Sequence, residues 1–272
     1  MSLNNADFLR YSRQILLADV GEAGQISLSQ ACVAIVGVGG LGNLLAQYLA
    51  AGGVGKLTLI DDDKVELSNL PRQLLFSDKD IGEYKSATAV HKLSNAYPDC
   101  NLQAVTDKLA EHNSQTLLAH MDLVFDCTDD FSTRHLINLT CLQVKLPLIT
   151  AAVANFSGQL FMVDMESAPE SGCYACLFPQ DSHLSQTCQS VGVLGPMVGV
   201  MASMQALLGM NLLLGLPVPT GTLLRFDGRA MRWREASLSR DLECHVCGGR
   251  VEPLRNQSRR PDPSLLREGG YQ

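Results

Sequence analysis

A glycine-rich loop between an apolar run and a helical segment is the feature that most restricts how this chain can fold. Residues 32–36 (Cys-Val-Ala-Ile-Val) are typical of a buried strand, and Gly37-Val-Gly-Gly-Leu-Gly42 follows at once, before a helical segment at 43–51. Such a turn brings backbone amides close to a phosphate, and the start of the helix adds favourable partial charge. We therefore expect an α/β sheet with a nucleotide bound at Gly37, Gly39, Gly40 and Gly42.

Short apolar runs and helical segments alternate along the rest of the chain. Strands are expected at 56–60, 102–105, 123–126, 146–154 and 158–163, and helices at 7–17, 85–97 and 132–144. Two late runs, 223–227 and 231–234, are typical of an antiparallel hairpin. The alternation predicts a Rossmann-like, doubly wound mixed sheet with helices on both faces. We expect residues 1–249 to form one domain and the polar residues 250–272 to form a disordered tail.

Composition and net charge limit which kinds of molecule this protein could bind. The chain is 46% hydrophobic and 18% charged, which excludes wholesale disorder, and its net charge of −7 argues against general nucleic-acid binding. Nine cysteines, with Asn4, Asn5 and Asp7 where a signal peptide would be apolar, indicate reduced thiols in the cytoplasm. The uncharged stretch 191–219 is long enough to span a membrane, but it lacks closely flanking Lys/Arg clusters. We expect a buried helix at 196–214 and no membrane.

Charged side chains follow the predicted strand ends. Asp61 ends the second strand, where a carboxylate can bond a ribose hydroxyl. Arg72, in the segment Ser68-Asn-Leu-Pro-Arg-Gln73, and Lys85 can stabilise the charge that develops when a triphosphate loses pyrophosphate. Asp129 is a candidate Mg²⁺ ligand, because a carboxylate beside phosphates is repelled unless a metal lies between them. Each charge alone could be solvated surface, but together they favour ATP over NAD.

Nine cysteines include two CxxC pairs, Cys173/Cys176 and Cys244/Cys247. Four thiolates are enough for a closed tetrahedral zinc site, which leaves no ligand position for water and is therefore structural. A redox dithiol or an iron–sulfur cluster is the alternative, and the paired spacing favours zinc. Cys188 stands outside both pairs in a polar stretch, where it is either a nucleophile toward an activated acyl group or an incidental loop cysteine.

Taken together, these residues resemble the adenylyltransferases of the ThiF/MoeB/HesA family, the bacterial relatives of ubiquitin-activating enzymes. The similarity runs from about residue 7 to residue 249. Besides the glycine loop and both cysteine pairs, it includes Arg10-Tyr-Ser-Arg-Gln14, Ser68-Asn-Leu-x-Arg-Gln73, Lys85, Asp126-Cys-Thr-Asp129 and Cys188. The segments Phe226-Asp-Gly and Cys244-x-Val-Cys-Gly-Gly look most like the thiamine-pathway branch.

The resemblance implies ATP-dependent adenylation of the carboxyl-terminal glycine of a small ubiquitin-like sulfur carrier (ThiS-like). A sulfur donor protein would then supply the thiocarboxylate used for the thiazole of thiamine. The alternatives are a MoeB-like enzyme acting on the molybdopterin synthase small subunit and, more remotely, a non-catalytic zinc-binding scaffold. The nucleotide would be held by Gly40, Asp61, Ser68, Asn69, Arg72, Lys85, Asp129 and Asp130.

The resemblance also assigns two residues outside this set. Arg13 would reach the phosphates in the partner subunit's site, which implies a homodimer, and Cys188 would form a covalent link with the carrier. Two positions depart from the family pattern, which usually has Gln at Pro71 and Asn at Asp130. Pro71 removes a backbone donor beside Arg72, and Asp130 adds negative charge near the expected metal.

Overall fold

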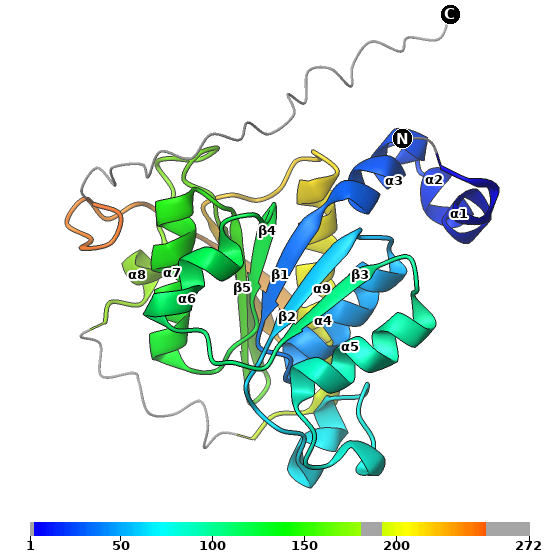
Figure 1. Ribbon diagram of the computed structural model, residues 1–272. Helices are drawn as coiled ribbons and strands as arrows, with labels where there is room; N and C mark the ends of the chain where they lie inside the picture. Colours follow the sequence, from blue (N-terminus) through cyan, green and yellow to red (C-terminus); the bar gives the residue numbers. More distant parts are fainter. Residues whose placement is uncertain (1–2, 181–191, 249–272) are drawn as a thin grey trace, which may run out of the picture.

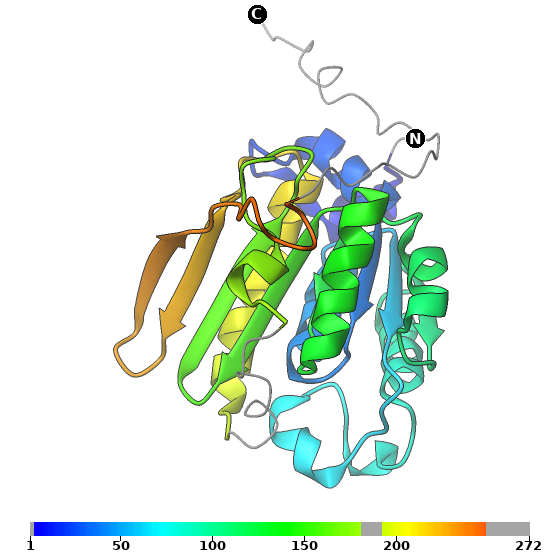
Figure 2. The same ribbon diagram turned by 90° about the vertical axis from the view of Figure 1, so that its left-hand side faces the viewer.

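The computed structural model describes residues 3–180 and 192–248 of this chain. Its centre is one eight-stranded sheet in the order β3-β2-β1-β4-β5-β6-β7-β8 (Figures 1 and 2). The strands are β1 (Cys32–Val36), β2 (Lys56–Ile60), β3 (Asn101–Val105), β4 (Leu123–Asp126), β5 (Leu148–Ala154), β6 (Ser157–Val163), β7 (Thr222–Asp227) and β8 (Arg232–Ser237).

The sheet is parallel from β3 to β5 and antiparallel from β5 to β8. β1 and β4 have buried residues on both faces, which is why they are continuous apolar runs and not alternating ones. The antiparallel part begins at a tight turn in which Asn155 has a φ of 53°. The predicted mixed Rossmann-like sheet with antiparallel carboxyl-terminal strands is confirmed.

Helices cover both faces of the sheet. Figure 1 shows α4, α5 and α9 on one face and α6 and α7 on the other. The helices are α1 (Asn5–Arg10), α2 (Ser12–Ile15), α3 (Gly21–Gln30), α4 (Gly40–Ala51), α5 (Lys85–Ala96), α6 (Glu111–Leu118), α7 (Phe131–Val144), α8 (Tyr174–Leu177) and α9 (Gly195–Leu213), with 3₁₀ turns η1 (Leu67–Arg72) and η2 (Asp78–Asp80).

Some helices differ from the sequence expectation. The helix expected at 7–17 is broken at Tyr11 into α1 and α2, and α3 and α6 were not expected. α6 buries only Ser114 and Leu118, and α3 buries only Gln25 and Leu28. Helices that bury so few apolar side chains lack the periodic pattern by which a helix is recognised.

Helix α9 lies where an apolar helix was expected. By length and composition alone it could cross a membrane, and about half of it is buried. It packs on β5, β6 and α4. The contact with the sheet is close at Gly209, where a Cβ atom would lie 2.2 Å from the Phe125 ring. The helix expected to be buried is buried only in part, since Leu207 is 54% exposed.

Candidate functional site

A cleft of about 970 Å³ opens at the carboxyl ends of the parallel strands. This is the edge at which open α/β sheets bind ligands, and the volume suits a small molecule. Its walls come from the glycine loop, the end of β2, η1, the start of α5 and the turn between β4 and α7. Segments far apart in the sequence therefore meet at one place because their strands all end there.

The glycine loop forms one wall of the cleft. Gly37 has a φ of 86°, and a Cβ atom there would lie 2.8 Å from the Cys127 carbonyl oxygen, so only glycine fits. Gly39 and Gly40 also line the cleft, and no side chain caps the start of α4. The first amides of that helix are thus available to an anion. Gly42 is buried in α4 and does not line the cleft, and a Cβ atom there would lie 1.9 Å from the Gly37 carbonyl oxygen.

Asp61 fastens this loop to the end of β2. Its Oδ2 accepts a hydrogen bond of 2.6 Å from the Val38 amide, and its Oδ1 accepts one of 2.8 Å from the Asp63 amide. Burial raises the pKa of the Asp61 carboxyl, although Lys85 and these two bonds oppose that rise. Asp61 lines the cleft as expected, and it also holds the loop in shape.

Two cationic side chains face the cleft. The Arg72 guanidinium donates to the Ser68 carbonyl oxygen at 2.9 Å, which orients it on η1. The Lys85 ammonium lies 2.8 Å from the Asp63 carboxylate, and the two side chains are 9% and 70% exposed. Sequence reasoning missed Asp63 as the partner of Lys85, although the acidic run that ends β2 was visible. An ammonium has three N–H donors, so Lys85 can contact an incoming anion while it keeps its bond to Asp63.

Asp129 and Asp130 differ in what holds them. Both line the cleft. The Asp129 carboxylate is exposed, and within the described residues no donor forms a hydrogen bond with it. Asp130 caps α7, since its Oδ2 accepts from the Thr133 amide and hydroxyl and from the Ser132 hydroxyl. Burial opposes ionisation, but these bonds outweigh it and lower the pKa of Asp130 to about 2. Of these two carboxylates, Asp129 is thus the one free to bind a ligand.

The η1 segment supplies further polar groups. Ser68 is exposed and Asn69 is buried, and both line the cleft. Gln73, which sequence reasoning quoted only as part of the motif, also lines it and is 2% exposed. Its Oε1 is buried with no hydrogen-bond partner among the described residues. A buried acceptor without a partner is costly, which indicates that a donor on a bound ligand could occupy it.

A buried ion pair supports the turn that carries Asp129, and sequence reasoning missed it. Arg134 Nε lies 3.9 Å from Asp126 Oδ2, with both side chains buried. Asp126 also accepts hydrogen bonds from the Thr128 hydroxyl at 2.7 Å and the Thr150 hydroxyl at 2.6 Å. Arg134 donates to the carbonyl oxygens of Thr128 and Ala151. This network fixes the β4–α7 turn against β5.

Of the cysteines outside the two pairs, Cys127 is the one that lines the cleft within the described residues. Its thiol is buried and donates to Gln205 at 3.6 Å, and burial raises its pKa far above the usual range. A thiol that stays protonated is a poor nucleophile. Cys188, the predicted nucleophile, lies outside the described residues.

Arg13 does not belong to the cleft of its own chain. It is exposed on α2, and its neighbour Gln14 donates to the carbonyl oxygen of Gly52, at the far end of α4 from the glycine loop. Twelve helical residues separate these two ends, which is about 18 Å at 1.5 Å per residue. Figure 1 places α1 and α2 at the end of the sheet opposite η1.

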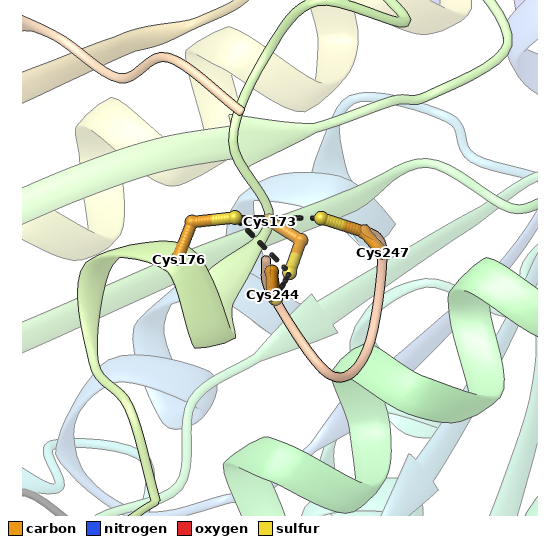
Figure 3. Close-up of side chains that lie close together, drawn as sticks. All are labelled: Cys173, Cys176, Cys244 and Cys247. Atoms are coloured by element: carbon orange, nitrogen blue, oxygen red, sulfur yellow. Dashed lines mark hydrogen bonds between the residues drawn. The ribbon is translucent and has the colours of Figure 1, made fainter. Parts of the chain in front are cut away.

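The four paired cysteines come together on the α7 side of the sheet. Cys173 and Cys176 flank the start of α8, and Cys244 and Cys247 follow β8 (Figure 3). Their Sγ atoms all lie within 4.8 Å of one another, and the separations include 3.9, 3.8 and 3.4 Å. Burial and the neighbouring thiols raise the pKa of Cys173, so four thiolates here require a cation. His245, between two of them, is exposed and outside the group.

Comparison with known proteins identifies the family. The ThiF family model matches residues 11–246. The chain belongs to the ThiF family. It is 45% identical over 248 residues to the sulfur carrier protein ThiS adenylyltransferase of Escherichia coli K12, covering 91% of this chain and 98% of that protein. It is 38% identical over 247 residues to the molybdopterin-synthase adenylyltransferase of the same organism, covering 90% and 98%.

Solved structures give the same fold for this ThiF-family chain. The Escherichia coli MccB structure with ATP superposes with a TM-score of 0.75 at 23% identity, over 88% of this chain and 75% of that one. MccB with an MccA variant gives a TM-score of 0.76 at the same identity, over 90% and 76%. At this identity the likeness supports the fold alone.

Proposed function

We propose that this chain uses ATP to adenylate the carboxyl-terminal glycine of a ThiS-like sulfur carrier, which enables thiocarboxylate formation for thiamine thiazole synthesis. The observation that carries the proposal is the cleft. It joins uncapped helix amides, two cations and an unpartnered carboxylate at one sheet edge. The substrate class is supported by the name of the relative that is 45% identical over 98% of its own length.

The reaction needs phosphate charge to be neutralised. The glycine carboxylate forms a bond to the α-phosphorus, the bond from that phosphorus to the bridging oxygen breaks, and pyrophosphate leaves with the electron pair. Arg72 and Lys85 stabilise the charge that grows on the leaving group. Asp63 holds the Lys85 ammonium in place. The uncapped amides of α4 bind phosphate oxygens, and Asp61 keeps that loop in position.

Asp129 would hold Mg²⁺ in this scheme. The donor chemistry fits, because carboxylate oxygen is the ligand Mg²⁺ prefers and Asp129 has no assigned donor within the described residues. The ion would supply charge compensation between Asp129 and the phosphates. Asp130 stands beside it, but its Oδ2 is engaged in capping α7, so its part in cofactor binding remains a prediction.

One structural Zn²⁺ per chain would be held by Cys173, Cys176, Cys244 and Cys247. Tetrahedral coordination with Zn–S bonds of about 2.3 Å requires sulfurs about 3.8 Å apart. The separations of 3.9 and 3.8 Å around Cys173 fit this requirement. The Asp241 amide also donates to Cys176 Sγ at 3.4 Å, as a partner that stabilises a thiolate. Zinc would thus join α8 to the segment after β8.

A homodimer would complete the site with the partner subunit's Arg13. This proposal is supported by the distance of Arg13 from its own cleft and by apolar side chains exposed around it. Those that are more than 45% exposed on α1, α2, the following turn and α4 are Phe8, Leu9, Leu16, Leu17 and Tyr48. Monomers rarely expose such clusters, so a second subunit is expected to cover them.

Sulfur transfer to the carrier would follow adenylation, in the cytoplasm. Cys188 would act after adenylation, when a sulfur atom of the sulfur donor protein attacks the activated acyl carbon and AMP leaves, since adenylation itself needs no thiol. A cytoplasmic location is supported by the eight described cysteines, all of which are free thiols. Residues 250–272, the proposed tail, lie outside the described residues.

The test is ATP–pyrophosphate exchange with purified carriers, read together with the mass of each carrier. We expect exchange with a ThiS-like carrier and, in the presence of a sulfur donor, a carrier heavier by the change from carboxylate to thiocarboxylate. Preference for the molybdopterin synthase small subunit would support the second function, which the relative at 38% identity favours. Exchange with neither carrier, by folded protein, would refute both.

A further inference from the structure

Helix α9 carries a buried polar side chain that the proposed reaction does not use. Within this helix, all of which the structure describes, eight residues are buried, and Gln205 is the only one of them with a polar side chain. It is 0% exposed. Burying a carboxamide is costly unless its donors and its acceptor are hydrogen-bonded, so a glutamine at this position needs specific partners.

Both ends of the Gln205 carboxamide contact the carboxyl end of strand β4. Its Nε2 donates to the carbonyl oxygen of Asp126 at 3.3 Å, and its Oε1 accepts a hydrogen bond from the Cys127 thiol at 3.6 Å. Asp126 is the last residue of β4, and Cys127 begins the turn that carries Asp129. One side chain of α9 therefore binds two consecutive residues at the point where the chain leaves the sheet.

Close packing of α9 on β4 brings Gln205 within reach of this turn. A Cβ atom at Gly209, four residues further along the helix, would lie 2.2 Å from the Phe125 ring of β4. Glycine at that position therefore lets the helix approach the strand closely. Because residues four apart lie on the same face of a helix, Gln205 faces the same strand.

The turn that Gln205 contacts also touches the glycine loop. A Cβ atom at Gly37 would lie 2.8 Å from the Cys127 carbonyl oxygen, so the loop and the turn are in contact. On the other side of the turn, Arg134 of α7 donates to the Thr128 carbonyl oxygen. Figure 1 shows α7 and α9 on opposite faces of the sheet. The turn is thus held from both faces, by one side chain from each helix.

Packing alone does not require a glutamine at position 205. Methionine or leucine would fill a similar volume on this apolar helix without a polar group to desolvate. A carboxamide instead restricts direction, because its planar end has one acceptor and two donors at set angles. The side chain therefore suits a role in holding the backbone of the turn rather than in filling the core.

We propose that Gln205 is a positioning residue, which holds the Asp126–Asp129 turn so that the Asp129 carboxylate faces the phosphates bound at the glycine loop. This inference rests on the proposed function, in which Asp129 holds Mg²⁺. Gln205 is absent from the cleft lining, so it acts through the turn and touches neither the nucleotide nor the metal. A displaced carboxylate weakens the site, because Mg²⁺ demands near-ideal geometry from its ligands.

The experiment measures ATP affinity by calorimetry, with Mg²⁺ and with EDTA, for wild type, Q205M, D129A and Q205M/D129A. Methionine keeps the length of the side chain and removes both hydrogen bonds. We expect Q205M to lower the affinity measured with Mg²⁺ by about 10-fold, the scale of losing a group that orients a metal ligand. The affinity measured with EDTA should change by less than about twofold, because the glycine loop, Arg72 and Lys85 keep their contacts.

A measurement without nucleotide or metal accompanies the affinities. Hydrogen exchange at the backbone amides of Thr128 and Asp129 should be faster in Q205M than in wild type, because the turn is then held from one face only. In the D129A background, Q205M should have no further effect on ATP affinity, since two residues that act through one group are not additive.

Matched variants keep the test specific. The Thr140 hydroxyl, buried on α7 and outside the cleft lining, donates to the Ser114 hydroxyl at 3.0 Å. T140V therefore removes a buried hydrogen bond elsewhere, and it should lower the melting temperature without changing the effect of Mg²⁺ on ATP affinity. Q205E is the conservative variant. Burial favours its neutral carboxyl, which offers one donor and one acceptor and should keep wild-type affinity at mildly acidic pH.

A second substitution serves if melting curves show that Q205M does not fold. Q205N stays polar, but its amide is withdrawn by one carbon–carbon bond, about 1.5 Å, and cannot reach both partners. The same loss of affinity with Mg²⁺ is expected.

The outcomes separate the positioning role from the function. The positioning proposal fails, and the proposed function stands, if the folded variant binds ATP with Mg²⁺ as tightly as wild type or leaves hydrogen exchange of the turn unchanged. It fails equally if Q205M has the same effect in the D129A background, or if T140V has the effect of Q205M. If wild type binds ATP no more tightly with Mg²⁺ than with EDTA, the metal role of Asp129 fails and the positioning proposal fails with it. If wild type binds no ATP at all, the proposed function itself is refuted.

Discussion

At the scale of single residues, four aspartates in the cleft have different structural roles. Asp61 shapes the glycine loop, Asp63 holds Lys85, Asp130 caps α7, and Asp129 is left for a ligand. The differences come from hydrogen-bond partners, since all four residues follow strands at one sheet edge. A carboxylate without a protein donor, such as Asp129, can accept a metal.

The two groups assigned to charge stabilisation give the first prediction. R72A and D129A should each lower carrier-dependent ATP–pyrophosphate exchange by at least ~10²-fold, the scale of losing one contact that stabilises the transition state. Exchange kinetics with saturating carrier measure this effect. Near-normal exchange in either variant, with the fold intact, would show that the ATP site is assigned wrongly.

Asp130 gives a prediction about stability. D130A should lower the free energy of unfolding by about 1 kcal/mol at pH 7, whereas D130N should retain most of it, because asparagine also caps helices. The folded pKa of about 2 lies below the ordinary value near 3.9. The stability due to ionised Asp130 is therefore present above about pH 4 and lost as pH falls toward 2.

Denaturant titrations between pH 2 and 7 measure the free energy of unfolding and so test that prediction. The difference in free energy of unfolding between wild type and D130A should be constant above pH 5 and should shrink as the pH falls toward 2. A difference that stays constant down to pH 2 would mean that the Asp130 carboxylate is not selectively stabilised in the folded state.

At the scale of elements, the cysteine cluster joins pieces that the sheet alone leaves loosely connected. α8 is four residues long, and the segment after β8 has no regular structure in its described part. Both pack on the core beneath α7 through Tyr174 and Leu238. A metal at the cysteines would supply the restraint that such short segments cannot obtain from their own backbone bonds.

Metal analysis and melting curves test the cluster. Purified protein should contain one zinc ion per chain, and C176S should lose it and melt several degrees lower, because structural zinc contributes to folding free energy. C32S is the matched control, since Cys32 lies outside the cluster. ATP affinity should change little in either variant. Iron in place of zinc, or no metal, would contradict the assignment.

At the scale of the whole molecule, α1 and α2 lie at the opposite end of the sheet from the cleft (Figure 1). They carry Arg13 and a group of exposed apolar side chains. Two copies related by a twofold axis can bring this end of one subunit to the cleft of the other, because the same patch serves both subunits. The site would then be complete only in the dimer.

Mixed dimers test this arrangement. R13A and D129A should each be inactive alone, and equal mixing with subunit exchange should restore about a quarter of wild-type activity. Half of the dimers are then mixed, and each mixed dimer has one site with both groups intact. Gel filtration confirms the dimer. Absence of recovery in proven mixed dimers would place Arg13 outside the partner's site.

The sequence by itself was enough to predict the central strands, the glycine loop and the mixed sheet, because buried apolar runs and glycine turns are local signals. It also predicted that the two cysteine pairs lie together, because their paired spacing is typical of a four-thiolate site. It did not reveal α3 and α6, which bury few apolar residues. Helix α9 was placed correctly, but only the packing shows that one side of it is exposed.

Tertiary structure decided which partners each side chain has. The pairing of Lys85 with Asp63, the buried Asp126–Arg134 pair and the unpartnered Gln73 depend on where separate strands and helices meet. Such contacts join residues that are distant along the chain. Residue type and spacing therefore predict which chemical groups the site contains, and packing determines which of those groups have no protein partner and can bind a ligand.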